Sequence, residues 1–181
     1  MPRRQVRKGS SGPESTGSGT GLPPVVGDFP RTLILGSYPG IQSLKKGEYY
    51  GNPQNHFWWI IENLFSVQKT LPYKERVRHL KEHNIALWDV VRSCSRQGSA
   101  DDKIRDPVFN DIFSFLETYP TIRLIILNGQ SAGRYFKELM ISGQLQTDIR
   151  TGILPSTSPA NARYTLAEKV NYWRIVRTEI I

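Results

Sequence analysis

The sequence has little of what metal, redox and secreted proteins depend on. It holds a single cysteine, Cys94, among 181 residues. One thiol excludes an intramolecular disulfide, a four-cysteine zinc site and a cysteine-ligated iron–sulfur cluster. His79 and His83 stand four residues apart, but the glutamate of an HExxH motif is missing. We therefore predict neither a metal site nor a cofactor.

Long apolar runs and phosphate-binding loops are missing as well. No segment is long and apolar enough to span a bilayer or to act as a secretion signal, so we expect an intracellular protein without a membrane partner. Residues 36–43, "GSYPGIQS", lack the GxGxxG spacing, and no Walker lysine follows a predicted strand. These absences argue against a dinucleotide-binding or ATP-binding enzyme.

Positive charge, by contrast, is abundant. The chain has 24 Lys and Arg against 16 Asp and Glu, which gives a net charge of +8. Such a charge favours an anionic partner, most commonly nucleic acid, although basic surfaces also serve solubility. Residues 1–30 contain fifteen Gly, Ser or Pro and read as a disordered basic arm. Residues 31–181 remain for a single domain, which we expect to be monomeric.

From residue 31 onward, short apolar runs alternate with segments of helical periodicity. Strands are predicted at 32–36, 85–91 and 122–129, and a fourth begins at 151 and runs into a loop. The predicted helices cover residues 57–65, 73–83, 107–119, 130–140 and 166–180. In the third of these helices the apolar stripe consists of Val108, Phe109, Ile112, Phe113 and Leu116. This alternation predicts an α/β fold with three α/β/α layers and a central, mostly parallel four-stranded sheet.

Ligands of such sheets bind outside the carboxyl ends of the strands. Four loops should meet there: residues 36–40 with the aromatic stretch 49–59, residues 89–99, residues 128–132 and residues 154–161. Each is rich in small or amide-bearing side chains. Taken singly, each loop is also typical of an ordinary turn.

Taken together, the loops resemble the uracil-DNA glycosylase superfamily. The motifs are a G-x-x-P-G turn after the first strand, then N-x-F-W, NG and P-S-x-S in that order. "YYGNPQNHFW", "ALWDV", "NGQSA" and "LPSTSPAN" are most similar to the hypoxanthine-DNA (deoxyinosine) glycosylase branch. The resemblance covers residues 31–177. It implies a DNA partner that carries deaminated bases, and hydrolysis of the N-glycosidic bond without a covalent intermediate.

The resemblance also implies roles for single residues. Phe57 would stack on the flipped base, with Tyr50 or Tyr49 in the wall of the pocket. Many members carry Asp or Asn where this chain has Tyr38, so the usual water-activating group is missing and Asn55 would take over catalysis. Some members place His or Asn where Leu154 stands. With only an amide at the centre, the chemistry would depend on positioning more than on proton abstraction.

The other candidate residues fall into two groups. The base-binding candidates beyond Phe57 and Tyr50 are Tyr38, Asn52, Asn128 and Asp89. The DNA-binding candidates are Ser37, Ser156, Ser158, Pro159, Ala160 and Asn161. Alternatives remain: Asn52 and Asn55 also suit helix capping, and Asp89 and Asn128 also suit the fixing of their loops. Trp58 and Trp59 are expected in the core.

Rival functions are a uracil-specific or mismatch-specific glycosylase, a catalytically silent DNA-binding module of the same fold, and a hydrolase of small nucleotides. A Schiff-base lyase with Lys45 or Lys46 as nucleophile is a further alternative. Uracil and hypoxanthine share a carbonyl acceptor beside an N–H donor, so hydrogen bonding alone does not separate them. A pocket shaped for a purine holds a pyrimidine loosely, and we therefore predict hypoxanthine as the preferred base.

Overall fold

A computed structural model describes residues 17–143, 145 and 148–178 of the chain. The strands in this part are β1 (Gly17–Thr20), β2 (Thr32–Gly36), β3 (Ile85–Asp89), β4 (Val91–Arg96), β5 (Arg105–Phe109), β6 (Leu124–Asn128) and β7 (Arg150–Leu154). The α-helices are α1 (Ile41–Lys46), α2 (Phe57–Phe65), α3 (Tyr73–Glu82), α4 (Ile112–Thr118), α5 (Gln130–Leu139), α6 (Leu166–Trp173) and α7 (Ile175–Thr178). Two short 3-10 turns, η1 (Asp101–Lys103) and η2 (Met140–Ser142), complete the list.

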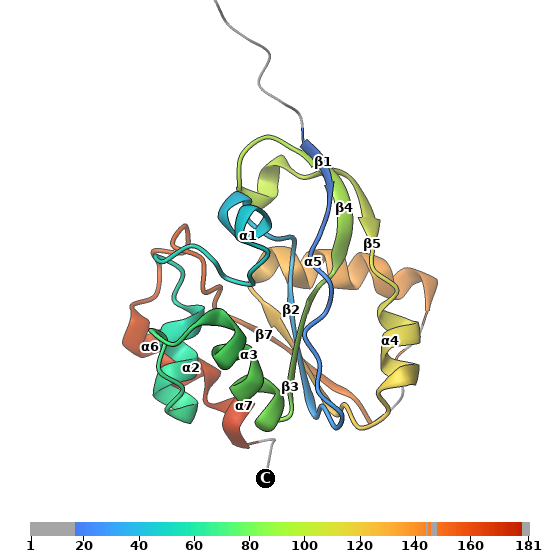
Figure 1. Cartoon of the computed structure of the whole chain (residues 1–181). Helices are drawn as coiled ribbons and strands as arrows, with labels where there is room; N and C mark the ends of the chain where they lie inside the picture. Colours follow the sequence, from blue (N-terminus) through green and yellow to red (C-terminus); the bar gives the residue numbers. More distant parts are fainter. Residues whose placement is uncertain (1–16, 144, 146–147, 179–181) are drawn as a thin grey trace, which may run out of the picture.

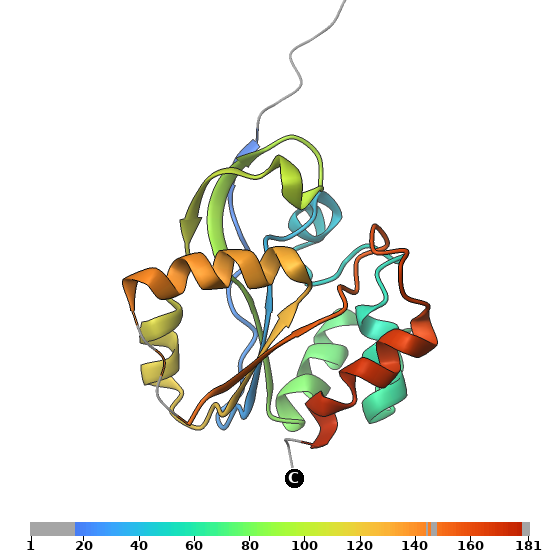
Figure 2. The same cartoon turned by 180° about the vertical axis from the view of Figure 1, so that it is seen from behind.

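The central sheet has four parallel strands in the order β3-β2-β6-β7. Side chains alternate between its two faces, so Leu33 and Leu35 of β2 join one core and Ile34 joins the other. Helices α4 and α5 cover the first face, and α2, α3, α6 and α7 cover the second (Figures 1 and 2). The predicted three-layer α/β/α fold with a parallel four-stranded sheet is confirmed.

A second, antiparallel sheet in the order β1-β4-β5 lies above the carboxyl ends of the central strands (Figure 1). Two predictions are wrong here, because residues 91–96 form a strand and the predicted helix at 107–119 begins only at Ile112. The side chain of Asp111 accepts a hydrogen bond from the amide of Ser114 at 3.0 Å and so sets the start of α4. Val108 lies instead in β5, where it pairs with Ser93 of β4, and it is 45% exposed.

The segment that precedes β2 is bound to the fold. The amide of Gly21 donates to the carbonyl of Arg92 at 2.7 Å, and Val25 and Leu87 exchange two backbone hydrogen bonds of 2.9 and 2.8 Å. Strand β1 pairs with β4 along its length. The predicted boundary between residues 30 and 31 is therefore wrong for residues 17–30, and residues 1–16 lie outside the described part.

Removal of residues 1–29 should lower the free energy of unfolding by about 3 kcal/mol or more, because several backbone hydrogen bonds are lost at about 1 kcal/mol each. Urea denaturation measures this change. A chain that starts at residue 17 keeps every one of these bonds and is the matched control. Equal unfolding midpoints for the two truncated chains would show that β1 adds nothing to stability.

Candidate active site

Three strands of the central sheet end in a row of residues at one edge. Asp89, the last residue of β3, pairs with Gly36, the last residue of β2. Leu35 pairs with Leu127, so Asn128 at the end of β6 flanks Gly36 on its other side. Residues in register point to the same face of a sheet, which places a carboxyl and a carboxamide on either side of a residue without a side chain. We call Asp89, Gly36 and Asn128 the polar row.

The hydroxyl of Tyr50 stands over this row. A Cβ atom at position 36 would collide with Oδ1 of Asp89 and would lie 3.9 Å from the hydroxyl of Tyr50. That hydroxyl accepts a hydrogen bond from Nδ2 of Asn128 at 3.1 Å, and its own proton remains available for donation. Burial raises the pKa of Tyr50, so the proton is retained at neutral pH. The site thus gathers a carboxyl, a phenol and a carboxamide, all suited to the edge of a nucleobase.

Tyr50 also covers one face of the Phe57 ring. The two rings are stacked, with centroids 3.8 Å apart and planes inclined by 18°. Phe57 is fully buried, and Trp58 and Trp173 pack against it edge-on. Tyr50, by contrast, is partly exposed. The stacking of Phe57 on a base stays a prediction: in this geometry Tyr50 covers one face of the Phe57 ring, and Tyr50 is the more exposed of the two residues.

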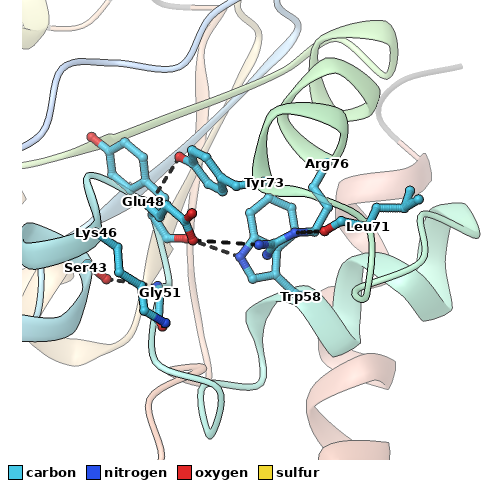
Figure 3. Close-up of polar contacts among 9 residues, drawn as sticks. Ser43, Lys46, Glu48, Gly51, Trp58, Leu71, Tyr73 and Arg76 are labelled. Carbon is cyan, nitrogen blue, oxygen red and sulfur yellow. Dashed lines mark hydrogen bonds and ion pairs between the residues drawn. The ribbon is translucent and has the colours of Figure 1, made fainter.

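The backbone around Tyr50 is held by three helices. Tyr50 has a φ of 55°, a left-handed conformation that is uncommon for residues other than glycine. Side chains from α1, α2 and α3 hydrogen-bond to the backbone on either side of it (Figure 3), namely Ser43, Lys46, Trp58 and Tyr73. The amide of Gly51 donates to Oγ of Ser43 at 3.0 Å, and the amide of Tyr49 donates to the hydroxyl of Tyr73 at 3.0 Å. These bonds keep the Tyr50 ring in its place against Phe57.

The side chain of Asn128 connects the end of β6 with the loop that contains Tyr50 and with the loop after β7. Besides Tyr50, its Nδ2 donates to Oγ1 of Thr157 at 2.9 Å, and its Oδ1 accepts from the amide of Thr157 at 2.9 Å. Thr157 is fully buried, and its carbonyl accepts from the amide of His56 at 2.9 Å. Both ends of the Asn128 amide are therefore occupied, which favours its loop-fixing role over contact with a base. Thr157 was missed because a threonine between two serines resembles any turn residue.

Asn52 and Asn55 each use the side-chain oxygen to close a local turn. Oδ1 of Asn52 accepts from the amide of Gln54 at 3.0 Å, and Oδ1 of Asn55 accepts from the amide of Phe57 at 3.0 Å. The second bond satisfies the amide of the first residue of α2, so the capping interpretation applies to Asn55, whereas the Asn52 bond lies outside any helix. It also fixes the carboxamide, whose Nδ2 has no hydrogen-bond partner in the described part of the chain. Asn55 therefore presents an oriented N–H donor.

The carboxyl of Asp89 is buried and only partly satisfied. Asp89 is 5% exposed, and its Oδ2 makes no hydrogen bond to any described residue. Burial, followed by the negative charge of Asp101, raises the pKa of Asp89 to about 8, and Arg96 opposes this shift. At neutral pH the group is therefore mostly protonated. Neither Asp101 nor Arg96 was among the predicted site residues, since the strand and turn that carry them were not foreseen.

Tyr38 and Ser37 are turned toward the small sheet. The hydroxyl of Tyr38 donates to the carbonyl of Gly19 in β1 at 2.6 Å, and the guanidinium of Arg96 lies 4.7 Å from its ring centre. Oγ of Ser37 donates to Oδ2 of Asp101 at 2.6 Å. Both side chains are buried. The predictions that Tyr38 binds the base and that Ser37 binds DNA are wrong for this geometry, because both hydroxyls are engaged inside the protein.

The loop after β7 is anchored by α6. Lys169 is fully buried, and its Nζ donates to the carbonyl of Asn161 at 3.0 Å and to that of Ser158 at 3.4 Å. The indole of Trp173 donates to the carbonyl of Pro155 at 3.0 Å. Burial lowers the pKa of Lys169. The helix thus fixes the path of residues 155–161 at both ends.

The predicted DNA-binding residues of this loop do lie together. Oγ of Ser156 accepts from the amide of Ser158, and Oγ of Ser158 accepts from the amide of Ala160, both at 3.2 Å. Nδ2 of Asn161 donates to the carbonyl of Ser156 at 3.0 Å. Each serine hydroxyl keeps a proton that it can donate outward. Pro159 and Ala160 are exposed at the tip.

No group of three or more His, Cys, Asp or Glu side chains within residues 17–143, 145 and 148–178 is arranged to hold a metal ion. The paired histidines have other contacts: Nδ1 of His79 lies 3.0 Å from Oε2 of Glu82, and the ring of His83 packs against Phe65. In the same part of the chain, the helices are all too short or too polar to cross a membrane.

Comparison with known proteins agrees with this architecture. Residues 23–177 match the model of the uracil DNA glycosylase superfamily. A solution NMR structure from Methanosarcina acetivorans, described as a candidate uracil DNA glycosylase, superposes with a TM-score of 0.75 at 35% sequence identity. The superposition covers 88% of this chain and 97% of that one. The chain therefore belongs to the uracil DNA glycosylase superfamily, as its motifs predict.

Relatives whose names state an activity indicate which branch of the superfamily this chain resembles. Hypoxanthine DNA glycosylase of Methanosarcina acetivorans is 40% identical over 146 residues, which cover 80% of this chain and 89% of the relative. Hypoxanthine DNA glycosylase of Methanosarcina barkeri is 35% identical over 150 residues, 82% of this chain and 92% of the relative. A G/U mismatch-specific uracil DNA glycosylase of Schizosaccharomyces pombe is 22% identical and is matched over 54% of its length. The similarity to the two archaeal proteins agrees with the predicted branch.

Proposed function

We propose that this protein is a monofunctional DNA glycosylase that releases hypoxanthine from deoxyinosine in DNA and so begins base excision repair inside the cell, acting as a monomer. The observation that carries the proposal is the polar row at the carboxyl ends of the strands, with the Tyr50 ring above it. The activity named for the two Methanosarcina relatives supports the choice of base. The net charge of +8 supports a nucleic-acid partner.

Tyr50 and the polar row both hold the extruded base, each through a different kind of interaction. The exposed part of the Tyr50 ring supplies a stacking surface, which Phe57 keeps rigid from behind. Asp89 lies beside it and offers hydrogen bonds along the edge of the base. Asn128 contributes to base binding only through its effect on Tyr50, since its own amide is already bound.

Asn55 supplies the hydrogen bond that strengthens in the transition state. As the N-glycosidic bond lengthens, negative charge grows on the departing base and positive charge grows on the sugar. An N–H donor that is already oriented stabilises the base without the cost of reorganising itself. Oδ1 of Asn55 is engaged with the amide of Phe57, so the free Nδ2 is the group available for this role. The chemistry then depends on a preorganised donor rather than on a strong base.

The rest of the site suits hydrolysis on duplex DNA. Ser156 and Ser158 hold phosphates through their free hydroxyl protons, and Pro159 with Ala160 enters the base stack. A lysine nucleophile has little support, since Nζ of Lys46 donates to the carbonyl of Gly51 at 2.7 Å beneath the Tyr50 loop. Hydrolysis by water therefore fits better than a Schiff-base step.

A single-turnover assay on duplexes with one deoxyinosine or one deoxyuridine opposite each normal base tests the proposal. We expect hypoxanthine to leave about 10²-fold faster than uracil, because a smaller base is held loosely in a purine-sized site. Sodium borohydride should trap no protein on the DNA, since no Schiff base forms.

Other outcomes identify the rivals directly. Faster release of uracil would assign the protein to a uracil or mismatch glycosylase. Tight binding to the deoxyinosine duplex without release of either base would indicate a silent DNA-binding module. Release from free nucleosides at the rate seen with duplex DNA would indicate a hydrolase of small nucleotides.

A further inference from the structure

The carboxyl of Asp89 is one of the buried polar groups of the described residues whose hydrogen bonding is incomplete, together with Nη1 of Arg96, Nδ1 of His56 and Oγ1 of Thr32. Its Oδ1 packs over Gly36, and its Oδ2 makes no hydrogen bond to any residue that the structure describes. The backbone carbonyl of Asp89 is satisfied by Nδ2 of Asn110 at 2.8 Å, which fixes the end of β3. A side-chain oxygen that is 95% removed from solvent and lacks a partner costs free energy unless a ligand completes it.

The surroundings of Asp89 favour its neutral form. The titratable or charged groups that face it are Asp101 from η1, Arg96 from β4, Tyr38 from the loop after β2, and Tyr49 and Tyr50 from the loop before α2. The cation among them is only partly engaged: Nη2 of Arg96 donates to the carbonyl of Pro39 at 2.5 Å, whereas its buried Nη1 makes no hydrogen bond to a described residue, and its effect on the pKa of Asp89 is smaller than that of burial. Burial keeps the tyrosines neutral at physiological pH, and the negative charge of Asp101 adds to the effect of burial on the pKa of Asp89. Burial therefore dominates, and Asp89 keeps its proton.

A neutral carboxyl matches the deaminated edge of a base. Hypoxanthine presents the O6 acceptor next to the N1–H donor. A protonated carboxyl has a donor and an acceptor at a similar separation, so the two groups can form a pair of parallel hydrogen bonds. A carboxylate has two acceptors and would face O6 with a lone pair and a negative charge. Protonation thus decides whether Asp89 can pair with this edge.

We propose that Asp89 recognises the lactam edge of the extruded base as a neutral carboxylic acid, donating to the carbonyl oxygen and accepting from the adjacent N–H. This inference rests on the proposed function and adds how a deaminated base is recognised, namely by a pair of hydrogen bonds with Asp89. Loss of the Asp89 proton abolishes the pairing. Excision therefore declines as the pH rises through the pKa of about 8, and it is sustained below that value.

The test is the pH dependence of single-turnover hypoxanthine release between about pH 6 and pH 10. The wild-type rate should fall by about tenfold for each unit above about pH 8, as expected when one proton must be retained. Asp89→Asn keeps a donor beside an acceptor and cannot ionise, so its rate at neutral pH should stay within about tenfold of the wild type, and its alkaline decline should begin only where the N1–H of deoxyinosine itself ionises, at a higher pH than in the wild type. Asp89→Ala should reduce release by about 10²-fold or more at every pH.

Three results would overturn the inference: a rate that rises through pH 8, an alkaline decline that begins at the same pH in Asp89→Asn as in the wild type, or equal inactivity of Asp89→Asn and Asp89→Ala. Binding to a duplex with non-hydrolysable 2′-fluoro-deoxyinosine separates this inference from the proposed function. If the wild type releases no hypoxanthine, selective binding of this duplex that weakens from about pH 8 in the wild type, and only at a higher pH in Asp89→Asn, still supports recognition of the base by Asp89. pH-independent binding in both proteins refutes it.

Discussion

Replacement of Asn55 by Ala should slow single-turnover hypoxanthine release by about 10²-fold or more, the size expected when one preorganised hydrogen bond to a developing charge is lost. Nδ2 of Asn55 is fixed by the bond between its Oδ1 and the amide of Phe57, so the donor is ready before the base arrives. Affinity for undamaged duplex should change little. Rapid-quench assays and fluorescence anisotropy measure the two quantities.

Asn55 also stabilises the start of α2, and the experiment must distinguish this structural effect from the catalytic one. The Ala variant also loses the bond to the start of α2, which stabilises the fold by about 1 kcal/mol. An aspartate side chain keeps the Oδ1 acceptor and removes the N–H donor, so Asn55→Asp isolates the catalytic contribution. Both variants should be slow. Normal release by Asn55→Asp together with slow release by Asn55→Ala would assign Asn55 to helix capping alone.

A methyl group at position 36 should have the second large effect. Gly36→Ala places a Cβ atom into Oδ1 of Asp89, so the carboxyl must move away from the end of β2. Displacement of a binding group by about 1 Å lowers excision on the order of 10²-fold. Overpacking should also reduce the free energy of unfolding by about 1–3 kcal/mol, which urea denaturation measures.

Gly40 provides the matched control in the same loop. A Cβ atom there would lie 3.7 Å from Oγ of Ser99, an ordinary van der Waals contact. Gly40→Ala should therefore leave both excision and stability near those of the wild type. If Gly36→Ala and Gly40→Ala behave alike, the close approach of Asp89 to β2 has no part in base binding.

Strands β2, β3 and β6 were predictable because they are buried and read as continuous apolar runs, whereas β7 at the edge of the sheet is largely exposed. Residues 32–36 form a strand with the predicted bounds, and α2 covers the predicted residues 57–65. Strands β1, β4 and β5 escaped prediction because their sequences, such as GSGT and VRSCSR, carry no apolar pattern. Their backbone pairing, rather than side-chain burial, makes them strands.

The errors in the predicted site follow from those missing strands. Tyr38 turns toward the small sheet because Gly19 of β1 offers its hydroxyl an acceptor, and Ser37 turns toward Asp101 of η1, a turn that was not predicted either. Asn55 stands as predicted in its loop, but its bond to Phe57 depends on the helix start that follows. Trp59, expected in the core, is 39% exposed and lies under the ammonium of Lys69 at 3.7 Å. The directions of these side chains depend on tertiary contacts and therefore could not be predicted from the sequence.

The polar row places a constraint on how the chain can vary in length. Its members come from three strands and meet only because these strands stay in register. Successive residues of a strand point to opposite faces, so deletion of one residue within β2 would carry Gly36 to the wrong face and set a neighbour between Asp89 and Asn128. Insertions in the connecting loops leave the row intact. Length variation compatible with activity is therefore confined to the connections between the strands.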